Sequence, residues 1–507
     1  MKGQLFATKS LKQLLEEMAG ENRLRRVLGP VQLTSLGVGA IIGAGIFVAT
    51  GAAARNVAGP ALMLSYVAAG VTCIFAALCY AEFASMVPVA GSAYTYAYAT
   101  LGEFFAWIIG WDLVLEYAVG AATVANGWSG YFQSVLAKFG AQLPPALAGP
   151  PIIYDTTAGH FVRTAGIVNL PAILIVTLVT VVLVKGIQES ASFNATMVFL
   201  KVTVVFFVIL VGAFYINPGN WSPFAPYGMS GLSFFGRPLM GQVNPGGQPV
   251  GMLAGAAIIF FAYIGFDSVS THAEEAKNPR RDVPIGIIAS LLICTVLYIA
   301  VVAVLTGMVK YDRLSVDAGV SDAFKQAGLP WAEFIIAAAG VAGITSVLLV
   351  LMLSAPRVFL AMARDGMVPP GFFGDVHPRF RTPWKSTILI GVFVSVLTGF
   401  LPIDALLHMT NIGTLFAFLI VCAAVLIMRR TNPNAERPFR APLYPLIPIL
   451  GILSCLMLMF SLPVENWYRL LVWMIIGFVI YFVYGYHHSH LRLKHDAVAA
   501  AGEHRRR

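Results

Sequence analysis

Residues 37–47 have the sequence Gly-Val-Gly-Ala-Ile-Ile-Gly-Ala-Gly-Ile-Phe, which places four glycines within nine positions of a long apolar run. Glycine weakens a helix by about 1 kcal/mol relative to alanine, so the pattern needs a reason. One explanation is close helix packing through Gly39 and Gly43, which have the small-xxx-small spacing. The other is a discontinuous helix whose unwound backbone lines a cavity. A half-helix beginning there would offer free N–H groups and a partial positive charge to an anion.

The composition is that of a protein embedded in a membrane. The chain has 507 residues, of which 58% are hydrophobic and 11% charged, and its mean hydropathy is +0.78. Soluble domains carry about 25% charged residues, so a soluble globular enzyme is excluded. The five cysteines lie in apolar runs without the spacing of a disulfide framework or a zinc site, and we interpret them as small core residues.

Long apolar runs recur along the chain, and a helix needs about 20 apolar residues to cross a bilayer. The runs fall at about 31–55, 60–87, 104–136, 169–186, 191–216, 249–272, 284–308, 331–362, 385–401, 404–428, 444–463 and 467–486. They predict an all-α polytopic membrane protein with about twelve transmembrane helices. The connections 144–169 and 218–249 are rich in Gly and Pro and are expected to be exposed loops.

The positions of the 33 Lys and Arg residues set the expected orientation. An even number of crossings puts both termini on one side, and most of the basic residues fall in the connections on that side. The positive-inside rule then predicts both termini in the cytoplasm of a plasma (inner) membrane protein. Topology accounts for the basic excess, so a nucleic-acid partner is not needed. We expect the chain to function in the lipid bilayer as a monomer.

Four segments are expected. Residues 1–30 form a cytoplasmic segment, in which Leu11, Leu14, Leu15 and Met18 have helical spacing, typical of an interfacial helix; a disordered tail is the alternative. Residues 31–430 form a ten-helix core, residues 431–487 add helices 11 and 12, and residues 488–507 form a cytoplasmic tail. His487, His488 and His490 lie at the charged tail, where solvated side chains are expected instead of a metal site.

A second interruption lies in the sixth run, where residues 261–268 have the sequence Phe-Ala-Tyr-Ile-Gly-Phe-Asp-Ser. Here Gly265 and Asp267 interrupt an apolar helix near its middle. Breaks in helices 1 and 6 are five helices apart, as an inverted repeat of five plus five helices predicts, with a substrate site at the interface of the repeats. The last two helices are then additions to the repeat.

Several motifs, in order along the chain, resemble the amino acid–polyamine–organocation (APC) superfamily, and most closely bacterial members of the cationic amino acid transporter family. They are 39–47, Trp111-Asp112 with Glu116-Tyr117, 261–267 continuing into 274–279, 284–287, 356–358 with 364–366, 410–415 and 438–442. The resemblance runs from about residue 28 to 487. It implies a secondary amino acid transporter and no enzymatic activity. The chain differs from the mammalian members in stopping near twelve helices, where they have fourteen.

Ionisable residues inside the membrane need a reason, because each costs roughly 2.5–3.5 kcal/mol at the bilayer centre. Lys201 lies deep in helix 5, and Glu116 and Asp267 lie in helices 3 and 6. Each could pair with a neighbour for structure alone. Alternatively, Glu116 and Asp267 could neutralise a substrate ammonium or carry a proton. Asp112 and Glu82 lie nearer to helix ends and are expected to be structural.

The resemblance implies roles for particular residues. In proton-coupled members a helix 5 lysine takes the position that sodium fills in sodium-coupled relatives, so Lys201 would contact the helix 1 backbone and the helix 8 hydroxyls of Thr345 and Ser346. The N–H groups of Gly43, Ala44 and Gly45 would hold a substrate carboxylate. The substrate ammonium would be held by carbonyl groups, namely those of Ile41, Phe261, Ala262 and Ile264. Protons are the expected coupling ion, with no metal and no other cofactor.

Specificity is expected to depend on helix 8. Residues 347–352 have the sequence Val-Leu-Leu-Val-Leu-Met, which is wholly apolar and bulky. A cationic side chain in a dry pocket needs an anion or several oxygens beside it, so Leu351 favours small neutral amino acids such as alanine over arginine. Together with the role implied for Lys201, these expectations make amino acid import by proton symport the leading hypothesis. The alternative within this class is an exchanger for cationic amino acids or polyamines; a membrane enzyme, a channel and a receptor are the competing classes.

Overall fold

The computed structural model describes residues 7–9, 28–43, 45–87, 92–155, 160–185, 191–234, 237–273, 276–316, 318–380 and 382–492. Each of the twelve apolar runs contains helix, so the predicted all-α polytopic fold is confirmed. The first run holds α3 (Pro30–Ile41), the π-helix η1 (Gly45–Ala49), α4 (Thr50–Ala53) and the π-helix η2 (Ala54–Ala58). The sixth holds α11 (Met252–Ile259), the 3-10 helix η5 (Phe260–Tyr263) and α12 (Ser268–Thr271).

The remaining runs form longer helices. They are α5 (Leu62–Met86), α7 (Glu103–Lys138), α9 (Leu170–Lys185), α10 (Ala191–Ala213), α13 (Pro279–Met308), α15 (Pro330–Arg364), α17 (Trp384–Phe400), α18 (Ile403–Thr431), α19 (Leu446–Met459) and α20 (Val464–Ile480), which continues through the π-helix η8 (Tyr481–Gly485) into α21 (Tyr486–His488). In the described part of the chain, eight helical stretches are long and apolar enough to cross a membrane, and the first of them, Pro30–Met86, contains both α3 and α5. The helices α9, α17 and α19 are apolar but shorter.

The connections hold short elements that the apolar pattern did not predict. They include α6 (Ser92–Thr100), η3 (Gly59–Ala61), α8 (Pro145–Ala148), η4 (Pro218–Trp221), η7 (Tyr311–Arg313), α14 (Gly319–Gln326) and α16 (Pro370–Phe373). The two predicted loops contain antiparallel pairs, namely β1 (Ile152–Asp155) with β2 (His160–Arg163), β3 (Leu232–Phe234) with β4 (Arg237–Met240), and β5 (Gln242–Val243) with β6 (Pro249–Val250). These are local hairpins, and they do not change the helical architecture.

Helices five apart in the predicted order pack against each other. The first four helices pack against their counterparts in the pairs η1 with η5, α5 with α13, α7 with α15, and α9 with α17. An internal repeat of five plus five helices accounts for this order of pairing. Long buried helices such as α7 therefore form the interior, and the two interrupted helices meet each other within it.

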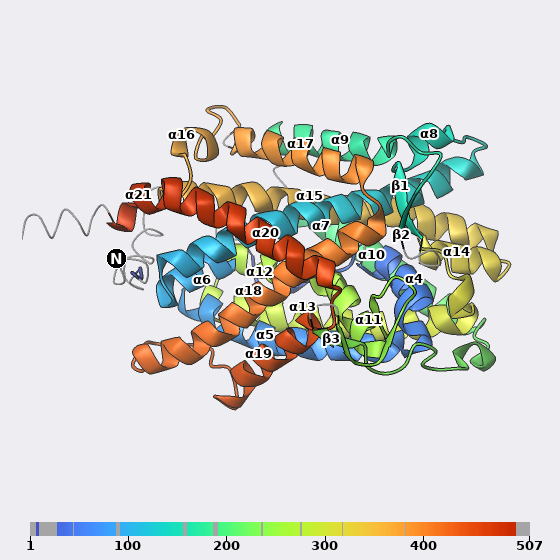
Figure 1. Cartoon of the computed structure of the whole chain (residues 1–507), viewed down its shortest axis with the longest axis horizontal. Helices are drawn as coiled ribbons and strands as arrows, with labels where there is room; N and C mark the ends of the chain where they lie inside the picture. Colours follow the sequence, from blue (N-terminus) through green and yellow to red (C-terminus); the bar gives the residue numbers. More distant parts are fainter. Residues whose placement is uncertain are drawn as a thin grey trace, which may run out of the picture.

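The helices run roughly along the longest axis of the molecule (Figure 1). We call the end that holds residues 7–9 and 485–492 the terminal end, where the Glu103 backbone N–H donates to the Ala7 carbonyl and the Ser489 hydroxyl donates to the Glu103 carboxylate. The other end, which we call the opposite end, holds β1, β2 and α14 (Figure 1, right).

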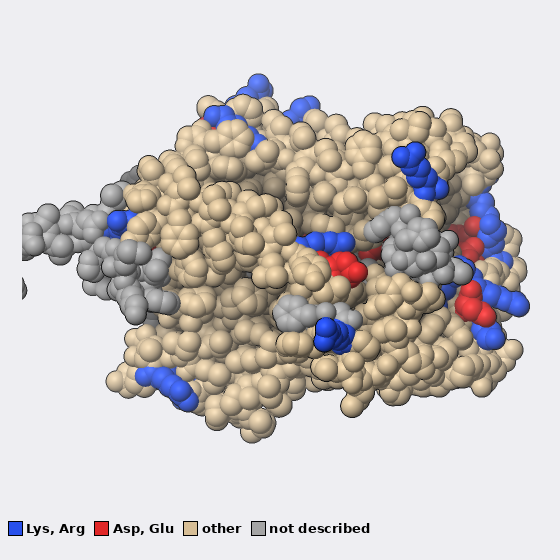
Figure 2. Space-filling model, viewed as in Figure 1, with Lys and Arg blue, Asp and Glu red and all other residues tan. Residues whose placement is uncertain are grey.

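The lateral surface is suited to lipid. On the face shown in Figure 2, most of the surface carries no charged side chain; the charged ones gather mainly at the opposite end, and a small group lies in the middle of the face. Along α20 the apolar side chains of Leu471, Val472, Ile475 and Val479 are half or more exposed. Apolar residues on the outside of a helix that is also apolar within are typical of a membrane-spanning segment.

Candidate functional site

The first interruption is a true break in helix 1. Regular helix ends at Ile41, and Ile42 has an extended backbone (φ −70°, ψ 106°) before the π-helix η1 begins at Gly45. Ala44, predicted to bind substrate, lies outside the described residues. Helix 1 is therefore discontinuous, and π-turns of the kind that follows are frequent at functional sites.

The second interruption lies in helix 6. Regular helix α11 ends at Ile259, η5 tightens the next turn, and Ile264 becomes extended (ψ 131°). Gly265 has φ +120°, a conformation that favours glycine. A Cβ at Gly265 would also lie 2.9 Å from the Ala40 carbonyl oxygen. The glycine thus permits both the turn and the close approach of helix 1.

The two breaks pack directly on each other. A Cβ at Gly45 would lie 2.2 Å from the Cα of Ala262, so the backbones of helices 1 and 6 touch at this point. A Cβ at Gly43 would lie 2.4 Å from Cγ2 of Val347 on α15. Gly43 and Gly45, the two glycines predicted to bind substrate, therefore also allow close packing, because protein atoms already occupy the space that a side chain would need.

A tyrosine that the sequence analysis missed connects the two breaks. The Tyr298 hydroxyl on α13 lies 2.7 Å from the Ile41 carbonyl oxygen and 3.1 Å from that of Ala262. Both carbonyls were predicted to hold a substrate ammonium, and here both face this hydroxyl. Tyr66 on α5 packs against the Tyr298 ring and donates toward the Gly45 carbonyl at 3.5 Å. A tyrosine within an apolar run has no spacing signal that would have marked it.

Asp267 bonds to its own break and to helix 3. Its Oδ1 accepts from the Gly265 N–H at 3.2 Å, and its Oδ2 accepts from the Tyr117 hydroxyl at 2.9 Å. The side chain is 1% exposed. This carboxylate therefore orders the turn of helix 6 and ties it to α7, in addition to any contact with substrate.

Glu116 lies one turn before Gly120 on α7 and is buried. Its carboxylate faces the Thr414 hydroxyl of α18 and has no other hydrogen-bonding group beside it among the described residues. Asp112, one turn earlier, packs on α18, where a Cβ at Gly413 would lie 2.7 Å from its Oδ1. A buried carboxyl with one hydroxyl beside it and no cation is costly if ionised, so Glu116 is available for a proton or a cation.

Lys201 contacts helix 1 just before its break. Its Nζ donates to the Gly39 carbonyl at 2.7 Å, and the side chain is 2% exposed. Its aliphatic stem lies against Gly343 of α15, where a Cβ would be 3.3 Å from its Cγ. The Thr345 hydroxyl donates to Val341 of its own helix and accepts from Trp128.

Ser346 likewise donates within α15, to the Gly343 carbonyl at 3.3 Å. The structure thus brings Lys201 to the helix 1 backbone, while the two predicted helix 8 hydroxyls bond to their own helix.

Leu351 faces the helix 6 break across a glycine of helix 3. A Cβ at Gly120 would lie 3.6 Å from Cδ1 of Leu351, 3.6 Å from Cγ2 of Thr410 and 3.9 Å from Cε2 of Phe261. Four helices therefore converge here around a position that has no side chain. The wall of this position is mainly apolar, with Glu116 one turn away along α7.

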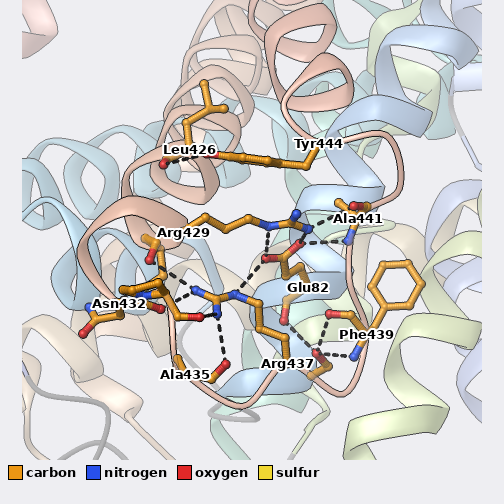
Figure 3. Close-up of polar contacts among 12 residues, drawn as sticks. Glu82, Leu426, Arg429, Asn432, Ala435, Arg437, Phe439, Ala441 and Tyr444 are labelled. Atoms are coloured by element: carbon orange, nitrogen blue, oxygen red, sulfur yellow. Dashed lines mark hydrogen bonds and ion pairs between the residues drawn. The ribbon is translucent and has the colours of Figure 1, made fainter.

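The terminal end contains a buried ion-pair cluster (Figure 3). Glu82 of α5 is 3% exposed and accepts from Nε and Nη2 of Arg429 at 2.9 and 2.6 Å. Nε of Arg437 lies 3.4 Å away, and the Ala441 N–H donates at 2.8 Å. The cluster ties α5 to α18 and to the connection that follows it. The structural role predicted for Glu82 agrees with these contacts.

The opposite end is hollow. A cavity of about 1060 Å³ lies between η2, α7, the 145–169 connection, α14 and the start of α18. Polar side chains from α7 line one wall, among them Asn126, Ser129 and Gln133. Helices at one end of the molecule are therefore joined by buried ion pairs, and the other end contains a polar cavity.

The fold and the site define a class of protein: a polytopic helical membrane transporter with two interrupted helices packed at its centre. Comparison with known families agrees, because residues 28–481 match the model of the amino acid permease family. The chain belongs to this family and to the APC superfamily.

Several curated relatives match most or nearly all of the chain. The branched-chain amino acid permease BcaP of Bacillus subtilis is 46% identical over 492 residues, covering 97% of this chain and 100% of the relative. The methylthioribose transporter of Bacillus subtilis is 43% identical over 485 residues, covering 96% and 98%. Human cationic amino acid transporter 4 is 37% identical over 424 residues, covering 82% of this chain and 61% of the relative.

Proposed function

We propose that this permease imports neutral amino acids across the plasma membrane by proton symport, with both termini in the cytoplasm. The observation that carries the proposal is the contact between the Lys201 ammonium and the Gly39 carbonyl, two residues before helix 1 unwinds. An ammonium in an apolar interior needs oxygen ligands to remain charged. A movement of helix 1 that removes this carbonyl would therefore favour release of the proton, which couples protonation to the conformation of the break.

The substrate zwitterion would lie between the two breaks. The N–H groups of helix 1 around Gly43 and Gly45 would hold its carboxylate, since the start of a helical segment carries partial positive charge. The carbonyls of Phe261 and Ile264 would hold its ammonium, together with those of Ile41 and Ala262 once Tyr298 yields them. Asp267 and Glu116 supply negative charge nearby.

The apolar position around Gly120 supports a neutral side chain. Leu351 and Phe261 border it, and apolar walls cannot solvate a guanidinium or an ammonium. The relative named for branched-chain amino acids supports this choice, whereas the relatives named for cationic amino acids favour the alternative. We expect Leu351→Ser to enlarge and polarise the position and to raise arginine binding, measured by competition against labelled alanine.

Uptake into proteoliposomes tests the coupling. The wild-type protein should accumulate labelled alanine when the interior is alkaline, whether sodium or potassium is the external cation. Lys201→Ala should abolish accumulation, and Lys310→Ala should not, because Lys310 is an exposed residue in the 309–318 connection. Sodium-dependent uptake by the native protein at fixed pH would refute proton symport.

An exchanger for cationic amino acids or polyamines is the second candidate, and the buried carboxylate of Glu116, which has no cation beside it among the described residues, favours it. Counterflow separates the two: an obligatory exchanger takes up label only when the vesicles contain substrate. If arginine or lysine competes best against alanine in the native protein, Glu116 becomes the side-chain partner, and Glu116→Gln should remove that preference.

A further inference from the structure

A second, smaller cavity of about 90 Å³ lies at the opposite end, outside the site between the two breaks. Its walls come from η2, the β5–β6 hairpin, the start of α18 and the first turns of α20. Asn56 and Asp404 line both this cavity and the large one. A water molecule needs about 10–15 Å³ measured in this way, so the space holds several waters or a small polar group.

One side chain in the wall of this cavity is an amide that is buried without a hydrogen-bond partner in the described part of the chain. Asn466, in the first turn of α20, is 0% exposed, yet neither its amide nitrogen nor its carbonyl oxygen has a hydrogen-bond partner among the described residues. An amide left unpaired in a protein interior costs about 1–3 kcal/mol. Such a group is expected to be hydrogen-bonded, and Asn466 lines the cavity. The contents of the cavity would supply the missing partners.

Charges of both signs surround the same space. Arg469 contributes a guanidinium, whose Nη1 lies 3.5 Å from the Ala405 carbonyl, and Asp404 and Glu465 contribute carboxylates. In Figure 2, basic and acidic side chains lie next to each other in the middle of the visible face, over the start of α20. The amides of Asn244 and Gln248 bond to each other at 3.2 Å on another wall, and Val57, Ile258 and Leu407 supply apolar surface.

We propose that this cavity is a binding site for a small zwitterion, separate from the transport site. Arg469 would bind the anionic group in the bidentate geometry that guanidinium favours, Asp404 and Glu465 would face the ammonium, and the Asn466 amide would bond to both. A ligand here would join η2, the outer half of broken helix 1, to α20. It would therefore hold helix 1 in the conformation seen in this structure.

Two sources could supply the zwitterion: a free amino acid, or the ethanolamine phosphate headgroup of a lipid. In the first arm, labelled leucine is titrated onto the purified protein in detergent. Wild type should bind leucine at one more class of site than Arg469→Gln does. In the variant, the affinity of this second site for leucine should fall about tenfold or more, because a charged hydrogen-bond donor is lost. Arg313→Gln, an exposed arginine at the same end, should match wild type.

In the second arm, the same three proteins are placed in nanodiscs with or without phosphatidylethanolamine, and bound lipid is counted by native mass spectrometry. One retained phosphatidylethanolamine in wild type and Arg313→Gln, absent in Arg469→Gln, would identify the headgroup as the ligand. Because each arm compares a variant with wild type, the outcome does not depend on whether leucine also binds at the transport site.

Asn466→Leu separates a binding role from a structural one. The substitution keeps the volume and removes the unpaired amide, so the ligand-free variant should melt at or above the Tm of wild type while losing the second site. A lower Tm for this variant would mean that Asn466 stabilises the fold. The proposal is overturned by that result, or if Arg469→Gln binds leucine and phosphatidylethanolamine as wild type does.

Discussion

The two ends of the molecule are built differently. At the terminal end, helices are joined by buried pairs: Glu82 bonds to two arginines, and Lys9 bonds to Asp365 at 2.6 Å with both side chains about one-eighth exposed. At the opposite end, helices separate around a cavity of about 1060 Å³ lined by amides, hydroxyls and charges. Similar apolar helices connect the two ends, so the difference comes from the residues at the helix termini.

This difference indicates which contacts must change during transport. A site between the two breaks can be reached from one side at a time only if one end closes while the other opens. Buried charge pairs join the helices at the terminal end, so we expect that opening this end requires separating them. Their strength should then set both the stability of this state and the ease of reaching the next one.

The largest effect is expected for Glu82→Ala, which leaves two arginines without their buried partner. Breaking a buried ion pair costs about 3–5 kcal/mol, so Tm in detergent should fall sharply and the terminal end should open. Cys79, buried one turn before Glu82, should then react with an impermeant maleimide, with the modified residue located by mass spectrometry.

The control for Glu82→Ala is Glu436→Ala, which removes an exposed pair at the same end. Arg280 and Glu436 lie 2.8 Å apart, but their side chains are 54% and 73% exposed. Exposed pairs contribute about 0–1 kcal/mol, so Tm and Cys79 reactivity should remain those of wild type. Equal effects of the two substitutions would contradict the view that burial makes the terminal end strong.

A smaller effect is expected between the two ends, where the broken helices touch. Gly45→Ala places a Cβ against the backbone of Ala262, which cannot rotate away, and overpacking of this kind costs about 1–3 kcal/mol. Gly43→Ala meets the side chain of Val347, which can yield, so it should cost less. Thermal unfolding of both variants measures the difference.

The double variant Gly43→Ala/Val347→Ala provides a check, because it removes the methyl group that the new Cβ would meet. It should recover whatever Gly43→Ala loses. A Gly45→Ala protein as stable as wild type would show that helices 1 and 6 can separate without cost, and the two ends would then move independently of this contact.

Lys9→Gln should have a moderate effect, because Asp365 keeps a hydrogen bond from the Tyr94 hydroxyl at 2.6 Å. Loss of one charged hydrogen bond costs about 1.5–3 kcal/mol when fully buried, and screening by solvent at these partly exposed side chains lowers the cost toward about 1 kcal/mol. Faster proteolysis near residue 9 should accompany the loss. Lys277→Gln, an exposed lysine at the same end, should cleave as wild type does; if both variants cleave alike, the pair does not fasten the N-terminal residues.

Features with a sequence period were predictable, and contacts between distant helices were not. The twelve helices follow from apolar run length, and both breaks follow from glycines and a carboxylate in runs that should have excluded them. Nothing local indicated that Tyr298 would face carbonyls of both breaks, or that Gly45 would touch Ala262. The interfacial helix predicted within residues 11–18 lies outside the described residues.

The smallest effect is expected for a partly exposed pair that joins the connection before α17 to the first turn of that helix. It would show that charge alone does not strengthen the terminal end. The hydrogen bond from Lys385, 2.7 Å away, lowers the pKa of the Asp375 carboxyl. A depressed carboxyl pKa contributes stability that is present above about pH 4, the ordinary value, and is lost as pH falls through the folded-state pKa. Because solvent screens this carboxyl, Lys385→Gln should leave Tm at pH 7 unchanged within error. Its Tm should also fall with decreasing pH in parallel with wild type, whereas Glu82→Ala should lie far below both at pH 7. A drop for Lys385→Gln comparable to that of Glu82→Ala would mean that solvent does not screen the charges at this end, and the contrast between buried and exposed pairs would fail.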